Sequence, residues 1–388
     1  MSGSYNAHSI YSASGAHRWM NCPPSAHLEQ QFPNETSTYA EEGTAAHDLA
    51  EHKLKKALKM RSKKPTSPYH SDEMDEMTDL YVEYCLELIQ KSKENCSDPQ
   101  ILIEQKLDFS DYVPEGFGTG DLVVVGDGNK SEKENGRGTL YVVDLKYGRG
   151  VIVSAEKNPQ MMLYALGALS LFDMLYDIEK VSMAIVQPRV DNFSTWEITV
   201  EELLKWAEEE LKPKALLAST GGGEFCAGDH CRFCRAKNQC RARAVKNLEL
   251  LKYEFQDPAL LTDEEIAEII GLADELAKWA GDIYTYATAL AINEGREWDG
   301  FKLVEGRTRR KFTDETAVAE TAKEAGYTDI FKQSLITITE MEKLMGKKKF
   351  NELLGSLVEK PKGKLTLVSE ADKRQAVDPI HAEFQVES

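Results

Sequence analysis

A carboxylate and an ammonium group stand close together in the apolar stretch YVVDLKYGRG, residues 141–150. Asp144 and Lys146 are two residues apart, so on a β-strand their side chains project from the same face. Asp121 ends the motif GTGD just before another apolar stretch. If the two stretches pair as a hairpin, the two aspartates converge at one end of a sheet. Two carboxylates suit Mg²⁺ or Mn²⁺, and a nearby lysine can orient an attacking water or stabilise charge on a phosphate.

Polar side chains on the flanking segments could join this chemistry. The motif EEGTAAH places His47 in the first turn of a predicted helix capped by Thr44, where its imidazole could bind a metal ion. The motif QMMLY places Gln160 and Tyr164 on one helical face, where both could hydrogen-bond a phosphate or a catalytic side chain. Taken singly, these residues also fit amphipathic helices without a catalytic role. The two aspartates likewise fit a solvated sheet end, where an ion pair adds little stability.

The predicted elements form an α/β core over about residues 40–220. QILIEQKLDF, GTGDLVVVG and GTLYVVDLKYG have the composition of three consecutive strands, and a helix, two more strands and another helix follow. A sheet framed by helices indicates an α/β fold. The predicted organisation has four parts: a helical region 1–98 with Cys22 and His47, the core 99–220, a cysteine-rich segment 221–246 and a mostly helical C-terminal region 247–388 of unknown role.

Composition and charge describe an ordinary globular chain. The 388 residues are 41% hydrophobic and 29% charged, with no run of eighteen apolar residues and no signal-like N-terminus. We therefore expect a cytoplasmic protein with no membrane partner. The formal net charge of −18 disfavours a general nucleic-acid coat but leaves room for local basic patches. Seven cysteines in a reducing compartment suggest a metal rather than disulfides.

The order of these motifs resembles that of the PD-(D/E)XK nuclease superfamily, and more narrowly its RecB-like branch, which includes the CRISPR-associated RecB-like nucleases. The series runs from GT-x-x-His at His47 through G-x-G-Asp at Asp121 and Asp-x-Lys at 144–146 to Gln-x-x-x-Tyr at 160–164. The resemblance covers about residues 5–245. Asp in place of Glu before x-Lys is a variation that the family pattern tolerates. In composition and motif order the chain is also similar to phage-encoded RecB-like nucleases found beside recombination genes.

The resemblance implies a restriction-endonuclease-like mixed sheet flanked by helices. It implies a metal-dependent deoxyribonuclease, an exonuclease, that acts in phage DNA recombination, replication or repair. The implied Mg²⁺ or Mn²⁺ ligands are His47, Asp121, Asp144 and the backbone carbonyl of Leu145. Lys146 would orient the nucleophilic water, and Gln160 and Tyr164 would hold the substrate or the lysine. Glu104, on the preceding strand, would stand behind the metal ligands without binding the metal.

The cysteines form a second candidate site. Cys231, Cys234 and Cys240 have the spacing C-x2-C-x5-C, and soft thiolates select iron–sulfur clusters or zinc. A zinc site of these three residues with Cys226 is one interpretation. With the distant Cys22 instead, the set resembles the iron–sulfur staple of the RecB-like branch. There, four thiolates bind a [4Fe–4S] cluster and clamp a helical region around the core, and this is the assignment that we favour.

Basic residues around the cysteines are the predicted contacts to DNA phosphates. They are Arg232, Arg235, Lys237, Arg241 and Arg243. A solvated helix face is the alternative for any such cluster. For the whole chain, the alternative to a nuclease is a stapled protein that binds DNA or a recombinase without cutting. Further predicted partners are a phage recombinase, an annealing protein or a helicase, in the cytoplasm of a bacterial host.

Overall fold

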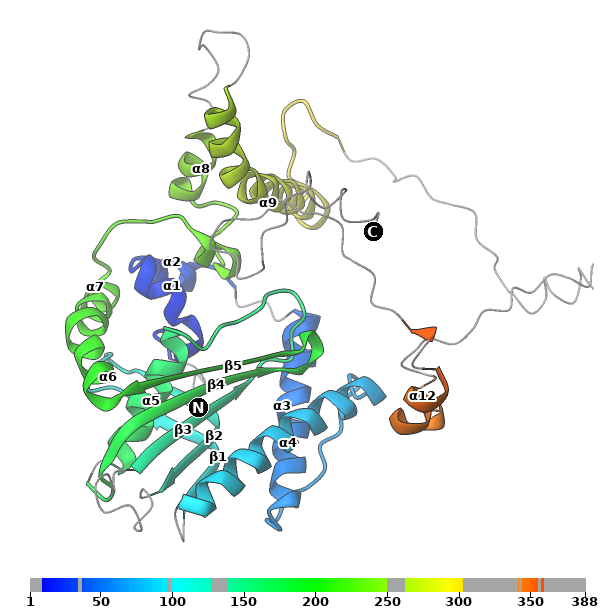
Figure 1. Ribbon diagram of the computed structural model, residues 1–388. Helices are drawn as coiled ribbons and strands as arrows, with labels where there is room; N and C mark the ends of the chain where they lie inside the picture. Colours follow the sequence, from blue (N-terminus) through cyan, green and yellow to red (C-terminus); the bar gives the residue numbers. More distant parts are fainter. Residues whose placement is uncertain are drawn as a thin grey trace, which may run out of the picture. The chain divides into compact units, whose positions relative to one another are not determined.

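The computed structural model describes residues 9–33, 37–95, 99–126, 138–172, 174–249, 262–302, 341, 344–354 and 357–358. The chain divides into two compact units, Met1–Ala287 and Thr288–Ser388. The first unit contains the sheet, the predicted site and the cysteine-rich segment (Figure 1). A described helix of the second unit is α12 (Lys347–Leu354). Most of the helical region predicted for this unit lies outside the described residues.

A five-stranded mixed sheet forms the core of the first unit, in the order β1-β2-β3-β4-β5. Its strands are β1 (Gln100–Asp108), β2 (Phe117–Gly126), β3 (Gly138–Leu145), β4 (Ile178–Gln187) and β5 (Asn192–Thr199). Neighbouring strands pair antiparallel except β3 and β4, which are parallel. A parallel pair needs a crossover connection, and helix α5 (Pro159–Phe172) supplies it. The predicted strands and the predicted α/β class are therefore confirmed.

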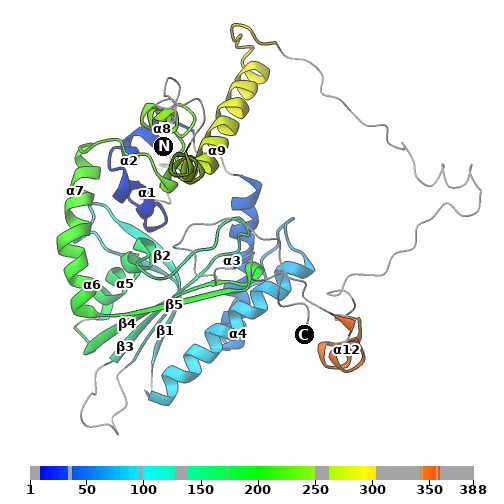
Figure 2. The same cartoon turned by 45° about the horizontal axis from the view of Figure 1, so that its top comes forward.

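Helices cover both faces of the sheet, as the two views agree (Figures 1 and 2). On one face, α3 (Thr38–Ala57) and α4 (Asp72–Asn95) pack on alternate residues of the strands, such as Leu122. On the other face, α5 packs on the intervening residues, such as Val123. This division follows from the two-residue period of a strand. Both faces of the central strands β2, β3 and β4 are buried, so these strands carry nearly continuous apolar runs, whereas β1 and β5 are partly exposed.

Shorter elements complete the described part of the chain. They are the 3-10 helices η1 (Ala13–Gly15), η2 (Glu29–Gln31), η3 (Pro188–Val190) and η5 (Asp229–Phe233), the π-helical turn η4 (Ala207–Leu211), and the helices α1 (Ala16–Asn21), α2 (Ser25–Leu28), α6 (Val200–Trp206), α7 (Lys212–Thr220), α8 (Arg241–Asn247) and α9 (Asp263–Asn293). A capping box fixes the start of α6, where Thr199 and Glu202 each accept the other's backbone N–H. Within the described ranges, no helix has the length and apolar character needed to cross a bilayer.

The predicted start of the helix that carries His47 is wrong. Ser37, not Thr44, is the N-cap of α3, and its Oγ accepts the backbone N–H of Ala40 at 3.2 Å. Thr44 lies inside the helix and donates its hydroxyl to the backbone carbonyl of Ala40 at 3.1 Å. Ala40, Glu41 and Glu42, which lie between the two candidate caps, are good helix formers, and the Ser37 cap satisfies a backbone N–H of the first turn, so the helix extends back to the earlier cap. His47 is consequently held well inside a helix rather than at its frayed end.

Candidate metal centre

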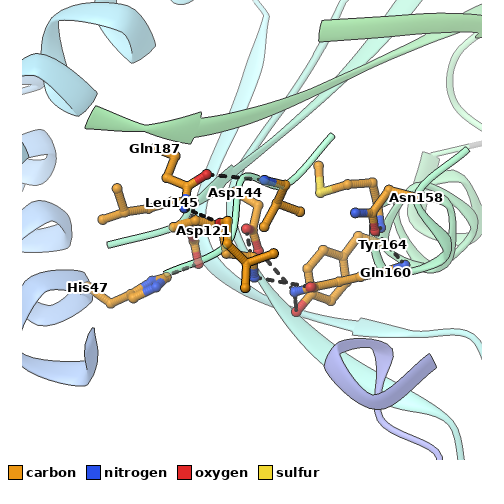
Figure 3. A network of polar contacts seen from close by, with 12 residues as sticks. His47, Asp121, Asp144, Leu145, Asn158, Gln160, Tyr164 and Gln187 are labelled. Atoms are coloured by element: carbon orange, nitrogen blue, oxygen red, sulfur yellow. Dashed lines mark hydrogen bonds and ion pairs between the residues drawn. The ribbon is translucent and has the colours of Figure 1, made fainter. Parts of the chain in front are cut away.

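The predicted catalytic residues lie together at one end of the sheet (Figure 3). The antiparallel register of β2 and β3 carries Asp121 and Asp144 to facing positions, as the hairpin interpretation expects. β3 ends one residue before Lys146, but the backbone N–H of Lys146 still donates to the carbonyl of Val186 at 2.8 Å. The lysine therefore keeps the direction of the strand, and its side chain remains on the same side as that of Asp144.

His47 of α3 contacts this end of the sheet through Asp121. Its Nδ1 lies 3.2 Å from Asp121 Oδ1, while Asp121 Oδ2 accepts the backbone N–H of Leu145 at 2.6 Å. Burial works to lower the pKa of His47, but the charge and hydrogen bond of Asp121 raise it to about 9. Burial works to raise the pKa of Asp121, but the charge of His47 lowers it. The two residues form an imidazolium–carboxylate pair, so binding a cation through His47 would release a proton.

A second set of contacts links Asp144, Lys146, Gln160 and Tyr164. Lys146 Nζ lies 2.9 Å from Asp144 Oδ2 and donates to Gln160 Oε1 at 3.1 Å. Gln160 Nε2 donates to Asp144 Oδ1 at 3.0 Å and to the Tyr164 hydroxyl oxygen at 3.1 Å. Burial raises the pKa of Asp144, although the charge of Lys146 opposes it. Gln160 therefore holds both members of the Asp-x-Lys motif in place.

Glu104 lies closer to this site than the sequence suggests. Glu104 could supply a metal-ligand atom together with His47 and Asp121, because one such atom from each residue lies within 4.8 Å of the other two. Among the described residues this is the only such group of three. The backbone of Glu104 has a φ of 52°, and the pairing of β1 with β2 is interrupted there, between Ile103 and Gln105. Burial, followed by the charge of Asp121, raises the pKa of Glu104 to about 7. Strained backbone concentrates at functional sites, so Glu104 is a candidate direct ligand.

The donor set in this region fits a hard divalent cation. His47, Glu104, Asp121 and Leu145 line one small pocket. Asp144 Oδ2 is buried and, besides its ion pair with Lys146, has no hydrogen bond among the described residues. Carboxylate and carbonyl oxygens with one imidazole suit Mg²⁺ or Mn²⁺ better than a soft metal.

Five cysteines line a second pocket, with an empty volume of about 310 Å³. They are Cys22, Cys226, Cys231, Cys234 and Cys240, and all are free thiols. The backbone N–H of Cys226 donates to Cys22 Sγ at 3.5 Å, so the N-terminal region does meet the cysteine-rich segment. No three of these sulfur atoms have the close spacing of the His47 group. Because all five cysteines line this pocket, it contains both predicted sets of cluster ligands, the one with Cys22 and the one with Cys226.

The N-terminal helices hold the cysteine-rich segment through Glu29. Its Oε2 accepts from Arg18 Nε at 2.6 Å, and its Oε1 accepts the backbone N–H of Arg235 at 2.8 Å. In the same segment, the guanidinium of Arg232 donates to the carbonyl of Gly150 at 3.5 Å. Gly150 follows the Asp-x-Lys motif closely in the chain. The cysteine-rich segment thus contacts both the N-terminal helices and the loop that leaves the candidate site.

The basic residues predicted to contact DNA divide into two groups. Arg232, Arg235 and Arg241 are exposed. Lys237 is paired with Asp282 at 2.9 Å. Arg243 is placed differently from the expectation, because it is buried and its guanidinium is committed to carboxylates of α9. The sequence does not predict the burial of Arg243, because its neighbours on this short helix are mostly exposed or half-buried. Its acidic partners lie on α9, which is distant in the sequence.

Two polar residues at the site, Asn158 and Gln187, do not belong to the predicted motif series. Asn158 precedes α5, and its Oδ1 accepts the backbone N–H of Gln160 at 3.0 Å, which fixes the start of that helix. Gln187 ends β4 and is 1% exposed, and its side chain bonds to the loop after β3 (Figure 3). In the sequence, Gln187 stands out only as a polar residue at the end of the apolar run MAIVQP. This pattern does not predict which backbone groups its amide contacts.

One family model matches most of the length of the chain. A family model described as a protein of unknown function, DUF2800, matches residues 8–375. The match takes in the sheet, the pocket beside His47 and the cysteine pocket. The chain therefore belongs to the DUF2800 family.

Proposed function

We propose that this protein is a metal-dependent deoxyribonuclease of the PD-(D/E)XK superfamily, in its RecB-like branch. The observation that carries the proposal is the convergence of Asp121, Asp144 and Lys146 at one sheet end, with Gln160 bonded to the last two. A simple ion pair at a sheet edge would not need the added imidazole of His47 and carboxylate of Glu104. The mixed sheet between helical layers is compatible with a restriction-endonuclease-like fold.

The residues divide the work of phosphodiester hydrolysis between them. His47, Asp121, Asp144 and the Leu145 carbonyl would hold Mg²⁺ or Mn²⁺, and Glu104 would extend this set. When bound, such a cation activates water and neutralises phosphate charge. Lys146 would orient the water for in-line attack and stabilise the charge that builds on the phosphate. Gln160, with Tyr164 behind it, would keep the Lys146 ammonium beside Asp144.

A specific observation favours a second candidate, a stapled protein that binds DNA or a recombinase without cutting. The net charge is −18, and two of the five predicted basic contacts, Lys237 and Arg243, are paired with carboxylates. Either function would place the protein on DNA in the cytoplasm of a bacterial host, with a phage recombinase, annealing protein or helicase as partner. We rank the nuclease first because a binding protein has no need of the clustered metal-ligand atoms.

Cleavage of end-labelled DNA separates the two candidates. We expect the purified protein to degrade linear DNA in Mn²⁺ and to leave it intact in EDTA, because the acidic site needs a cation to approach a phosphate. Closed circular DNA of the same sequence serves as the matched substrate, and an exonuclease leaves it uncut. Intact linear DNA in Mn²⁺, together with a gel shift of the same DNA, would instead favour the binding protein.

For the cysteine pocket we propose a [4Fe–4S] cluster held by Cys22, Cys231, Cys234 and Cys240. The pocket supports a soft metal because it gathers thiols and N–H donors to sulfur, such as the Gly228 N–H to Cys231 at 3.5 Å. Iron–sulfur sites are held by thiolates and tuned by such hydrogen bonds. Zinc held by Cys226 with the other three is the competing occupant.

Protein purified without oxygen is expected to show a broad visible absorbance and to contain iron. Cys22→Ser should remove both signals, whereas Cys226→Ser, its neighbour in the pocket, should keep them. The two variants are matched because they replace the same atom in the same pocket. Colourless protein containing zinc, with the reverse behaviour of the two variants, would contradict the iron–sulfur assignment.

A further inference from the structure

The segment that joins Lys146 to Gln160 has no regular secondary structure, although both of its ends carry residues of the proposed network. Backbone N–H and carbonyl groups in such a segment still need hydrogen-bond partners. Here side chains at the end of β4 and the start of β5 supply several of the partners. The course of the segment is therefore set in large part by residues outside it.

Gln187 provides most of these partners and uses its whole carboxamide. Nε2 donates to the backbone carbonyls of Gly148 at 2.8 Å and Val151 at 2.7 Å. Oε1 accepts the backbone N–H of Val153 at 3.2 Å and the side-chain N–H of Asn192 at 3.1 Å. The residue is 1% exposed, so water does not compete for these positions. An amide with two donors and two lone pairs is fully satisfied by four such bonds.

Neighbours of Gln187 extend the same set of contacts along the segment. Along the segment, the backbone N–H of Lys146 donates to Val186 O at 2.8 Å. Asn192 Nδ2 donates to Val153 O at 2.9 Å, and the backbone N–H of Ala155 donates to Ser194 Oγ at 2.9 Å. The segment is thus bonded at intervals from the lysine almost to the start of α5. A shift anywhere along it would move one of its ends relative to the other.

We propose that Gln187 is a positioning residue for catalysis, which sets the course of the segment and thereby the placement of Lys146 against Gln160. The inference rests on the proposed nuclease function and adds a residue to it. The hydrogen bonds of Gln187 go to the segment and to Asn192, so it acts on the network only through the backbone. Lys146 Nζ and Gln160 Oε1 are 3.1 Å apart, a contact that a small displacement would break.

Gln187→Glu is the sharpest variant, because it keeps the size of the side chain and replaces both N–H donors by an oxygen. That oxygen would face the carbonyls of Gly148 and Val151 without a proton to share. We expect kcat in Mn²⁺ to fall about a hundredfold, the loss associated with a misplacement of about 1 Å. KM and the Mn²⁺ dissociation constant should be unchanged, because the candidate metal ligands are not altered.

Gln30→Glu supplies the matched control. It makes the same chemical change at an exposed glutamine whose Nε2 bonds within its own helical region, to Ala26 O at 3.3 Å. Asn192→Ala is the second test variant, and it removes one bond to Val153 and one to Gln187. We expect a smaller loss of kcat from it, and less than additive losses in the double variant, since both side chains hold the same segment.

Amide hydrogen exchange gives a readout that does not depend on activity. The N–H groups of Val153 and Ala155 should be protected in the wild-type protein and in Gln30→Glu, and should exchange faster in Gln187→Glu. Faster exchange with unchanged kcat would overturn the positioning role, as would unchanged exchange. Equal losses in kcat and Mn²⁺ affinity would show general damage and also overturn it. A wild-type protein that binds Mn²⁺ but does not cut DNA would instead refute the proposed function itself.

Discussion

Asp144→Asn is expected to abolish DNA cleavage while the protein stays folded. The amide can still accept the hydrogen bond from Gln160 Nε2, so the packing at the sheet end is kept. It cannot supply the negative charge that faces Lys146 at 2.9 Å or bind a divalent cation well. We expect kcat to fall about a thousandfold or more, as for removal of a group that acts on developing charge. The measurement is a single-turnover assay in Mn²⁺, with thermal unfolding recorded on the same samples.

Glu197→Gln is the control for this substitution. Glu197 and Lys180 form an exposed carboxylate–ammonium pair at 3.1 Å across β4 and β5, in the same sheet but away from the candidate site. The same carboxylate-to-amide change there should leave cleavage unaltered. Cleavage by Asp144→Asn at the rate of this control would refute the assignment of Asp144 to the catalytic network.

Arg243→Ala is expected to destabilise the first unit by about 3 kcal/mol, as for the loss of one member of a buried ion pair. The Arg243 side chain is 2% exposed, and its guanidinium lies 2.7 Å from Glu275 and 2.7 Å from Asp282. Removing it takes away the guanidinium that pairs with Glu275 and leaves Asp282 with Lys237 alone. Urea unfolding at neutral pH measures the change. Arg241→Ala, at an exposed position of the same helix, should change the unfolding free energy by no more than about 0.5 kcal/mol.

The loss caused by Arg243→Ala should depend on pH in a definite direction. Burial works to raise the pKa of Asp282, but hydrogen bonds from Arg243 and Lys237 hold it below its ordinary value. Stability from a lowered carboxyl pKa is complete above the ordinary value, about 3.9, and is lost as the pH falls through the lowered one. The difference between Arg243→Ala and the wild type should therefore shrink below about pH 4. A difference that is the same at pH 7 and in acid would contradict this account.

The strands and the convergence of Asp121 with the Asp-x-Lys motif could be predicted because local pattern determines them. A strand that is buried on both faces carries a near-continuous apolar run, so Asp144 and Asp121 stand out as the exceptions. The hairpin between β2 and β3 then requires that the two aspartates face each other. Thr44 and Ser37 both suit an N-cap by residue type, and only the extent of the helix decides between them.

The rest of the site depends on contacts between distant parts of the chain. The approach of Glu104 to His47 follows from a left-handed backbone in the middle of a strand, which a glutamate rarely adopts. Gln187 acquires its role from carbonyls of a segment about forty residues away in sequence. Arg243 is buried only because α9 returns to cover it. None of these features leaves a periodic trace in the residue types.

The site has a further property that follows from the parallel pairing of β3 with β4. Lys146 lies just before the crossover through α5, whereas Gln187 lies at its far end. Ribosomes add about 5–20 residues per second, so synthesis of the roughly forty residues between them takes on the order of two to eight seconds. During that interval the nascent protein holds Asp121, Asp144 and Lys146 without the strand that fixes their loop. Under the proposed nuclease function, a chain that is interrupted in this region would lack the residue that positions Lys146, so we expect DNA cleavage only from molecules whose sheet is complete.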